Sequence, residues 1–326
     1  MTLIVSAVVG NWAIHASDRL VGKKRTPAAE PIEHDAHSNK TVIVCARECW
    51  VVMGYTGLAY LAGRPTDQLI AEAVSGYDDL SDAAFTYWQP PTDLHYREIR
   101  DRVEAKLGSA YATLPKSVAS RYATTVLGAG IQRKGGKVHK VMFRTTARGD
   151  SVASAELGPT VDDFRAFRVY AVGMTHRPTL DRAQDRIRAL HCPPEELADT
   201  VRDILKDAVL ETHSLVPASV GEDVMTVVLD NQNRNVRTAL HVADPARQAA
   251  LHQQAMADGD EQFASLLTIS TPFALTPGMI YGPSVANPGG WIMNNGITFE
   301  FSGFDNDPPR WQGNAFFAAQ PRKPKP

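Results

Sequence analysis

Short runs of apolar and β-branched residues dominate the first 60 positions and predict paired strands. Leu3 to Val9 and Trp12 to Ala16 are such runs, and Gly10-Asn11 between them is typical of a tight turn. Lys40 to Cys45 and Cys49 to Tyr55 repeat the pattern around a second turn. The last of these runs is apolar almost throughout, which favours a strand buried on both faces. We therefore expect two β-hairpins at the start of the chain.

Helical and strand patterns then alternate in blocks. Helices are predicted from an N-cap at Thr66 to a stop at Gly76, over Asp93 to Leu107, over Leu180 to Leu190 and over Pro194 to Thr212. Further strands are predicted over Tyr122 to Ile131, Val138 to Thr146, Arg168 to Gly173 and Val224 to Leu229. Residues 20–39 and 77–92 read as loops. This order predicts an α+β fold, a four-layer α/β/β/α sandwich of two antiparallel sheets flanked by paired helices.

The composition changes near residue 230. Residues 1–230 hold the strong periodic patterns, whereas residues 231–326 are interrupted by Pro and Gly, as in Asn287-Pro288-Gly289-Gly290. We expect a C-terminal extension over 231–326, with a helix in 248–267, short strands near 291–293 and 297–301, and a disordered tail over 320–326. The extension is expected to pack on the first domain or on a neighbouring subunit.

Charge and cysteine usage exclude several classes of protein. A net charge of -2 leaves no basic excess for binding phosphates, so we expect no nucleic-acid partner. No apolar run reaches the roughly 18 residues needed to cross a membrane, and the first residues lack the basic start of a signal peptide. Three cysteines give no disulfide framework and indicate a reducing compartment. We expect a cytoplasmic protein that needs no cofactor and binds no membrane.

The first strand has a special position, because it is predicted to begin at residue 2 and we expect no leader before it. Removal of the initiator Met is expected before a residue as small as Thr, and it would leave Thr2 with a hydroxyl and a free α-amino group. These two groups are a nucleophile and a base on one residue. An α-amino group titrates near pH ~8, close to where a general base works best.

Two charged residues stand where the predicted hairpins end and begin. Asp18, in Ala16-Ser17-Asp18-Arg19, closes the first hairpin, and Lys40 opens the second. An ammonium near Thr2 would favour the charged form of its hydroxyl, and a carboxylate would balance and orient that ammonium. Taken singly, a surface ion pair or a solvated lysine on an edge strand is the more common role of such residues.

The turn Tyr55-Thr56-Gly57-Leu58-Ala59 follows the second hairpin and leads into the first predicted helix. With Thr2, Asp18 and Lys40, and with the later segments Ala171-Val172-Gly173 and Val220 to Val224, it completes an order and spacing that resembles the N-terminal-nucleophile hydrolases. Within that superfamily the chain is most similar to the group of proteasome β-subunits and bacterial HslV peptidases. The resemblance covers roughly residues 2–230.

The resemblance implies a role for each site residue. Thr2 would be the nucleophile, Asp18 and Lys40 its charged partners, and the Gly57 N–H an oxyanion donor contributing ~3 kcal/mol. Ser219 would match the serine of the family's second Asp and Ser pair. The implied reaction is hydrolysis of a peptide or small amide through an acyl-Thr2 intermediate, and the implied assembly is a homo-oligomer.

Several alternatives stay open. The interval between Asp18 and Lys40 is longer than in the family, so Lys23 and Lys24 are weaker candidates for the lysine. Val216 stands where the family has an aspartate near the serine, and Gly173-Met174-Thr175 lacks another serine. The chain could instead be a non-catalytic, proteasome-like assembly subunit, or an amidase of a small-molecule amide.

One group of cysteines and histidines in the sequence is a candidate zinc site. Cys45 and Cys49 lie close to His34 and His37 in the chain, and these residue types bind zinc. However, three residues separate the cysteines, and they flank a predicted hairpin turn. Two small buried side chains are therefore the favoured interpretation, and we expect no metal.

Overall fold

A computed structural model describes most of the chain up to residue 241 and short strands after it. The described residues are 2–23, 32–35, 38–80, 85–90, 93–158, 167–241, 243, 257, 269–270, 272–282, 285–286, 297–302 and 310–313. Apart from residue 257, the predicted helix over 248–267 falls outside these ranges, as do the predicted strand over 291–293 and the predicted disordered tail.

One sheet is built around the N-terminal hairpin. Its strand order is β13-β1-β2-β14-β15-β20-β21, and each neighbouring pair is antiparallel. The strands are β1 (Leu3–Val9), β2 (Trp12–Asp18), β13 (Arg168–Gly173), β14 (Val224–Asp230), β15 (Asn235–His241), β20 (Ile297–Ser302) and β21 (Arg310–Gly313). The predicted hairpin is confirmed, with Val9 opposite Trp12. Because β1 and β2 lie inside this sheet, every residue of both strands is buried.

The other sheet is built around the second hairpin, in the order β12-β11-β10-β6-β5-β17-β18-β9. Its strands are β5 (Thr41–Cys45), β6 (Cys49–Thr56), β9 (Phe85–Trp88), β10 (Thr124–Lys134), β11 (Lys137–Arg148), β12 (Ser151–Glu156), β17 (Phe273–Thr276) and β18 (Gly278–Tyr281). The pairing of β17 with β5 is parallel, with Ala274 opposite Ile43. The other pairs are antiparallel, and the predicted hairpin around Gly135-Gly136 is confirmed.

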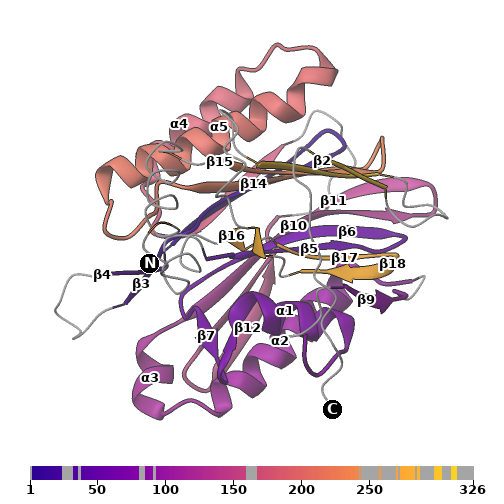
Figure 1. The fold of residues 1–326 in the computed structure, drawn as a ribbon. Coiled ribbons are helices and arrows are strands. Elements are labelled where there is room, and N and C mark those ends of the chain that lie inside the picture. Colours follow the sequence, from indigo (N-terminus) through magenta and orange to yellow (C-terminus); the bar gives the residue numbers. More distant parts are fainter. Residues whose placement is uncertain are drawn as a thin grey trace.

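Two helix pairs lie on opposite sides of the two sheets (Figure 1). The helices are α1 (Thr66–Ser75), α2 (Tyr96–Ala112), α3 (Lys116–Arg121), α4 (Arg177–Arg188) and α5 (Pro194–Leu215). One apolar cluster joins α1 and α2 to the eight-stranded sheet, another joins α4 and α5 to the seven-stranded sheet, and a third lies between the sheets. The predicted α+β class is confirmed.

Alternation along the strands explains these layers. In β1, Leu3, Val5 and Ala7 pack toward α4 and α5, whereas Val8 packs between the sheets. In β5, Val42 and Val44 face α1 and α2, whereas Ile43 faces the other sheet. Successive side chains of a strand point to opposite faces, so strands that are apolar on both faces can form an inner layer.

Some predicted boundaries are wrong. The loop predicted over 20–39 contains the two short strands β3 (Val21–Lys23) and β4 (Ile32–Asp35), and the loop over 77–92 contains β9. Thr66 is the first residue of α1 rather than its cap, since Pro65 holds the cap position without a side-chain hydrogen bond. Helix α2 continues past Gly108 because Ala110 and Tyr111 still bury their side chains in the core.

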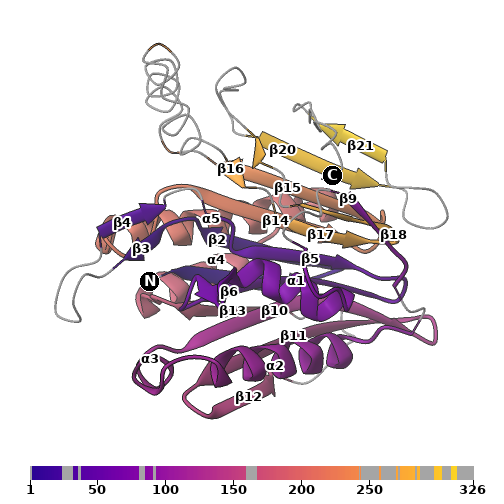
Figure 2. The same ribbon diagram turned by 60° about the horizontal axis from the view of Figure 1, so that its bottom comes forward.

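Segments of the expected C-terminal extension join both sheets (Figure 2). Strand β15 pairs with β14 and then with β20, and β17 and β18 lie between β5 and β9. Two further small pairs are β7 (Tyr60–Leu61) with β8 (Arg64–Pro65), and β16 (Ile269–Ser270) with β19 (Val285–Ala286). The division of the chain at residue 230 stays a prediction.

Candidate functional site

The Asp18 carboxylate is the centre of the candidate site. It ends strand β2, its side chain is fully buried, and four donors from the described part of the chain face it. Oδ1 accepts a hydrogen bond from Leu3 N at 2.8 Å, and Oδ2 accepts from Leu20 N at 3.1 Å and from Gly221 N at 3.0 Å. The fourth donor is the Lys40 ammonium, 3.1 Å from Oδ2. A buried carboxylate requires such compensation, because an isolated charge is very costly to remove from water.

Lys40 is brought to Asp18 by the position of β5. It directly precedes this strand, is 2% exposed, and also donates to the Leu20 carbonyl at 2.5 Å. Because β5 lies between β6 and β17, Lys40 is not the solvated edge-strand lysine that its sequence context most commonly indicates. The side chains of the alternatives, Lys23 and Lys24, lie outside the described structure.

Asn39 supports the turn that presents Lys40, a role that the sequence did not indicate. Its side-chain amide donates to the Thr41 carbonyl at 2.9 Å and to Asp67 Oδ2 at 2.6 Å, and its Oδ1 accepts from Thr41 N at 3.2 Å. Burial raises the pKa of Asp67 to about 6, although the hydrogen bond from Asn39 opposes this shift. Asn39 therefore links the start of β5 to the first turn of α1.

The start of the described chain is fixed by the peptide group that follows Thr2. The Thr2 carbonyl accepts from Met174 N at 2.8 Å, and the next amide, Leu3 N, donates to Asp18. Leu3 also lies opposite Gly173 in the pairing of β1 with β13. Thr2 itself is 6% exposed. The single peptide group that joins Thr2 to Leu3 is thus held at both its oxygen and its nitrogen, which places Thr2 next to Asp18.

Gly57 lies close to the same end of the sheets, and its backbone requires glycine. Its φ is +112°, and a methyl group there would overlap the Ala123 carbonyl oxygen. The preceding residue, Thr56, is near Thr2: a methyl group at Gly173 would overlap the Thr2 carbonyl oxygen and lie 3.0 Å from Thr56 Oγ1. Gly57 is exposed, so this turn lies at the surface beside the start of the chain.

The residues after Gly57 are held by hydrogen bonds from two elements. Leu58 N donates to Thr124 Oγ1 at 3.3 Å, and the Leu58 carbonyl accepts from Thr66 Oγ1 at 2.7 Å. The Tyr111 hydroxyl on α2 donates to Thr124 Oγ1 at 2.8 Å. A donor group must be rigid to stabilise developing charge, and this turn has that property.

Ser219 lies on the segment that supports Asp18 without touching it. It is 8% exposed and donates its N–H to the Val216 carbonyl at 2.9 Å, and Gly221 two residues later donates to Asp18. Within the described part of the chain, no hydrogen bond joins Ser219 to Thr2, Asp18 or Lys40. The structure therefore brings Thr2, Asp18 and Lys40 together, with Gly57 nearby and Ser219 at the periphery. The roles of all five residues stay predictions.

The two cysteines do not face one another. Cys45 packs between the two sheets, whereas Cys49 packs in the apolar cluster between the eight-stranded sheet and helices α1 and α2. Burial raises the pKa of both thiols far above the ordinary value, which keeps them neutral. Among the residues that the structure describes, no group of three or more His, Cys, Asp or Glu side chains could hold a metal ion. His37 and the His34 side chain lie outside that part.

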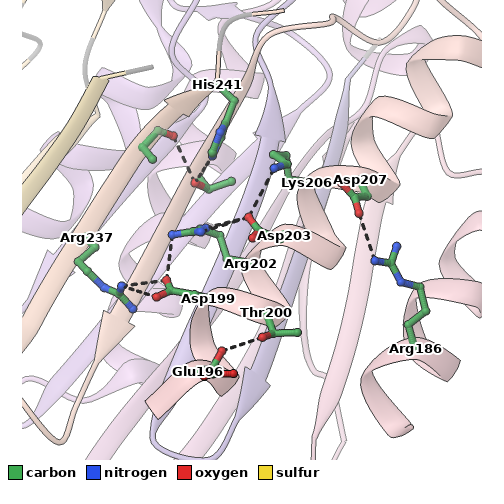
Figure 3. Close-up of polar contacts among 12 residues, drawn as sticks. Arg186, Glu196, Asp199, Thr200, Arg202, Asp203, Lys206, Asp207, Arg237 and His241 are labelled. Carbon is green, nitrogen blue, oxygen red and sulfur yellow. Dashed lines mark hydrogen bonds and ion pairs between the residues drawn. The ribbon is translucent and has the colours of Figure 1, made fainter. Parts of the chain in front are cut away.

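A second cluster of charged side chains lies on α5 and β15 (Figure 3). Arg237 donates to both oxygens of Asp199 at 2.8 and 3.0 Å, and Arg202 bridges Asp199 to Asp203. These groups are partly exposed, so each pair is worth little stability. The carboxylates of Asp199 and Asp203 are already paired with arginines, so we interpret this cluster as a set of ion pairs that holds β15 against α5.

Comparison with protein-family models and with curated proteins found no match. Among solved structures, the chain is similar to a eukaryotic HslV from Trypanosoma brucei, at 14% sequence identity and a TM-score of 0.35. The matched region covers 70% of this chain and 99% of that protein. A likeness at this level decides nothing about the chemistry of this chain. Among the described residues, no helix combines the length and apolar character that a membrane crossing requires.

Proposed function

We propose that this protein is a threonine-dependent amide hydrolase whose nucleophile is Thr2, exposed by removal of Met1. One observation carries the proposal. The Asp18 carboxylate, fully buried, accepts from the amide that follows Thr2 on one oxygen and from the Lys40 ammonium on the other. A buried ion pair is often no more stabilising than apolar side chains of similar size, so its presence beside a chain start favours a chemical role.

The proposed reaction has two halves. In the first, the Thr2 α-amine takes the hydroxyl proton, and the oxygen attacks the carbonyl carbon of an amide. The Gly57 N–H stabilises the resulting oxyanion, and the C–N bond then breaks while the leaving amine takes the proton from the α-ammonium. In the second half, water attacks the acyl ester with the α-amine again as base, releasing a carboxylic acid and free Thr2. Lys40 stays charged throughout and lowers the cost of negative charge on the Thr2 oxygen.

We also propose a specific fold type for the α+β architecture. Two mainly antiparallel sheets between two helix pairs support a four-layer sandwich of the N-terminal-nucleophile type. We further propose a proteasome-like homo-oligomer that acts on peptides or small amides. The rival function, a non-catalytic assembly subunit, predicts that Met1 is retained and that Thr2 never reacts.

Intact-mass spectrometry tests the proposal. The purified protein is measured before and after treatment with a β-lactone, an electrophile that acylates an activated hydroxyl. The expected result is the mass of the chain without Met1 and, after treatment, a single adduct that peptide mapping assigns to Thr2. The Thr2→Ala variant should gain no adduct, while Thr113→Ala, which changes an exposed threonine at the end of α2, should be labelled like the unmodified sequence.

Retention of Met1 together with the absence of an adduct would contradict the proposal and favour the assembly subunit. An adduct on Thr2 without hydrolysis of peptides would instead indicate that the substrate is a small amide. Lys40→Ala should abolish labelling without loss of the fold. If labelling continued unchanged, another lysine, such as Lys23 or Lys24, would have to serve.

A further inference from the structure

A chain of four polar side chains crosses the mainly apolar space between the two sheets, close to the candidate site. Ser6 Oγ lies 2.9 Å from His15 Nδ1, His15 Nε2 lies 3.2 Å from Thr41 Oγ1, and Thr41 Oγ1 lies 3.2 Å from Ser17 Oγ. All four residues are at most 1% exposed. The cluster beside them consists of residues such as Ile43 and Val52. Polar groups in such a place need complete partnering, because each unpaired one costs about 1–3 kcal/mol.

The chain of hydrogen bonds connects the two sheets. Ser6 and His15 are directly opposite one another on β1 and β2, and Ser17 is two residues further along β2. Thr41 is the first residue of β5, in the other sheet. Both bonds of the Thr41 hydroxyl therefore run from the eight-stranded sheet to the seven-stranded sheet.

A glycine in the facing sheet makes room for the imidazole. Gly54 lies opposite Thr41 in the pairing of β5 with β6. A methyl group there would overlap His15 Cε1 and lie 2.9 Å from both His15 Nε2 and Ile4 Cγ2. Any other residue would have to displace the histidine from Thr41. The ring is neutral in this place, because burial lowers the pKa of His15 to about 3. A neutral imidazole has one donor and one acceptor nitrogen, which fits two hydroxyl neighbours.

Two adjacent members of this chain, Thr41 and Ser17, are covalent neighbours of the buried ion pair. Thr41 follows Lys40, and Ser17 precedes Asp18. We propose that Ser6, His15, Thr41 and Ser17 form a positioning network that fixes the strand carrying Lys40 against the strand carrying Asp18. The network holds the Lys40 ammonium at hydrogen-bonding distance from Asp18 and thereby at Thr2. The effect of the network on the reactivity of Thr2 rests on the proposed function, whereas its effect on the position of Lys40 does not.

Thr41→Val tests the network, because it removes the hydroxyl and nearly keeps the shape. The rate of Thr2 acylation by the β-lactone should fall about tenfold or more, the effect of one or two neutral hydrogen bonds. Thr41→Ser, which restores the hydroxyl and leaves out a methyl group, should recover the rate to within about threefold. Equal rates in the valine variant and the unmodified sequence would overturn the proposal. So would equally slow rates in both variants, since packing rather than hydrogen bonding would then be responsible.

Reductive methylation of Lys40, followed by peptide mapping, separates this proposal from the proposed function. In Thr41→Val, Lys40 should be methylated at least several times faster than in Thr41→Ser and the unmodified sequence. If no protein is labelled at Thr2, the proposed function fails, and the methylation rates alone decide the positioning role. Equal protection of Lys40 in all three proteins would overturn it. If the valine variant does not fold, Ser17→Ala and Ser6→Ala replace it in the same two measurements, with the same expected direction.

Discussion

The substitution Asp18→Asn tests whether the buried carboxylate is the centre on which the start of the chain depends. Asparagine has the same shape, but it has one acceptor oxygen and an NH₂ group in place of two acceptor oxygens. Among the described residues, Oδ2 faces three donors, from Leu20, Lys40 and Gly221, whereas Oδ1 faces one, Leu3 N. The least costly placement therefore turns the NH₂ group toward Leu3 N.

Two penalties follow from this placement. Leu3 N loses its acceptor, which costs about 1–3 kcal/mol for a buried group. Lys40 loses the carboxylate that compensates its charge, and breaking a buried pair costs about 3–5 kcal/mol. Because the two penalties overlap, we expect the free energy of unfolding to fall by about 4 kcal/mol at neutral pH. Labelling of Thr2 should be lost as well.

Urea unfolding of the variant and the unmodified sequence gives the comparison. The control Asp150→Asn, on an exposed turn between β11 and β12, should change stability by less than about 0.5 kcal/mol. Lys40→Met should cost less than Asp18→Asn, since the carboxylate would keep three N–H donors. The double variant should lose about 2 kcal/mol less than the sum of the single losses. A loss below about 1 kcal/mol for Asp18→Asn, or strictly additive losses, would refute the reasoning.

Three further outcomes are expected. Gly57→Ala should destabilise the protein by more than about 2 kcal/mol and abolish labelling, since φ is +112° and the methyl group would overlap Ala123; normal labelling would contradict its role. The pKa of His15 is lowered to about 3, so the unfolded chain binds more protons between pH 3 and 6.5, and stability falls as pH falls through that window. At pH 5 the loss from this group is about 2 kcal/mol, and unfolding curves of His15→Gln should show a shallower decline. Arg237→Met should cost under about 1 kcal/mol by thermal unfolding, because its pair with Asp199 is partly exposed; a larger loss would show that the cluster does more than fasten β15.

The hairpins could be predicted because their signals are local. Two apolar runs around Gly10-Asn11 define β1 and β2, and the turn at Gly135-Gly136 joins β10 to β11 in the same way. The proximity of Asp18 and Lys40 was expected from the family resemblance in the order and spacing of these residues, not from the strand patterns. Strand β9 was missed because its pairing partner, β18, is almost 200 residues away in the sequence. A single sequence contains no local sign of such a pairing.

The groups that hold Asp18 and Lys40 in place could not be predicted from residue types. Three of the four described donors to Asp18 are the backbone amides of Leu3, Leu20 and Gly221, which any residue except proline could supply. His15 was missed for a different reason. In sequence it is one polar residue in an apolar strand, and only the facing hydroxyl of Thr41, on another sheet, shows what it bonds to. Such placements depend on how the sheets stack, which periodicity does not specify.

The parallel pairing of β17 with β5 has a consequence for how the protein is made. The strand that follows Lys40 gains its outer neighbour only from residues 273–276, more than 200 positions later. During synthesis at ~5–20 residues per second, β5 would wait on the order of ten seconds or more with an open row of backbone groups. An unpaired apolar edge of this kind invites association with other chains. The ribosome-bound chain should therefore need protection until its last quarter emerges, and a nascent chain stalled at residue 230 should aggregate where the full chain does not.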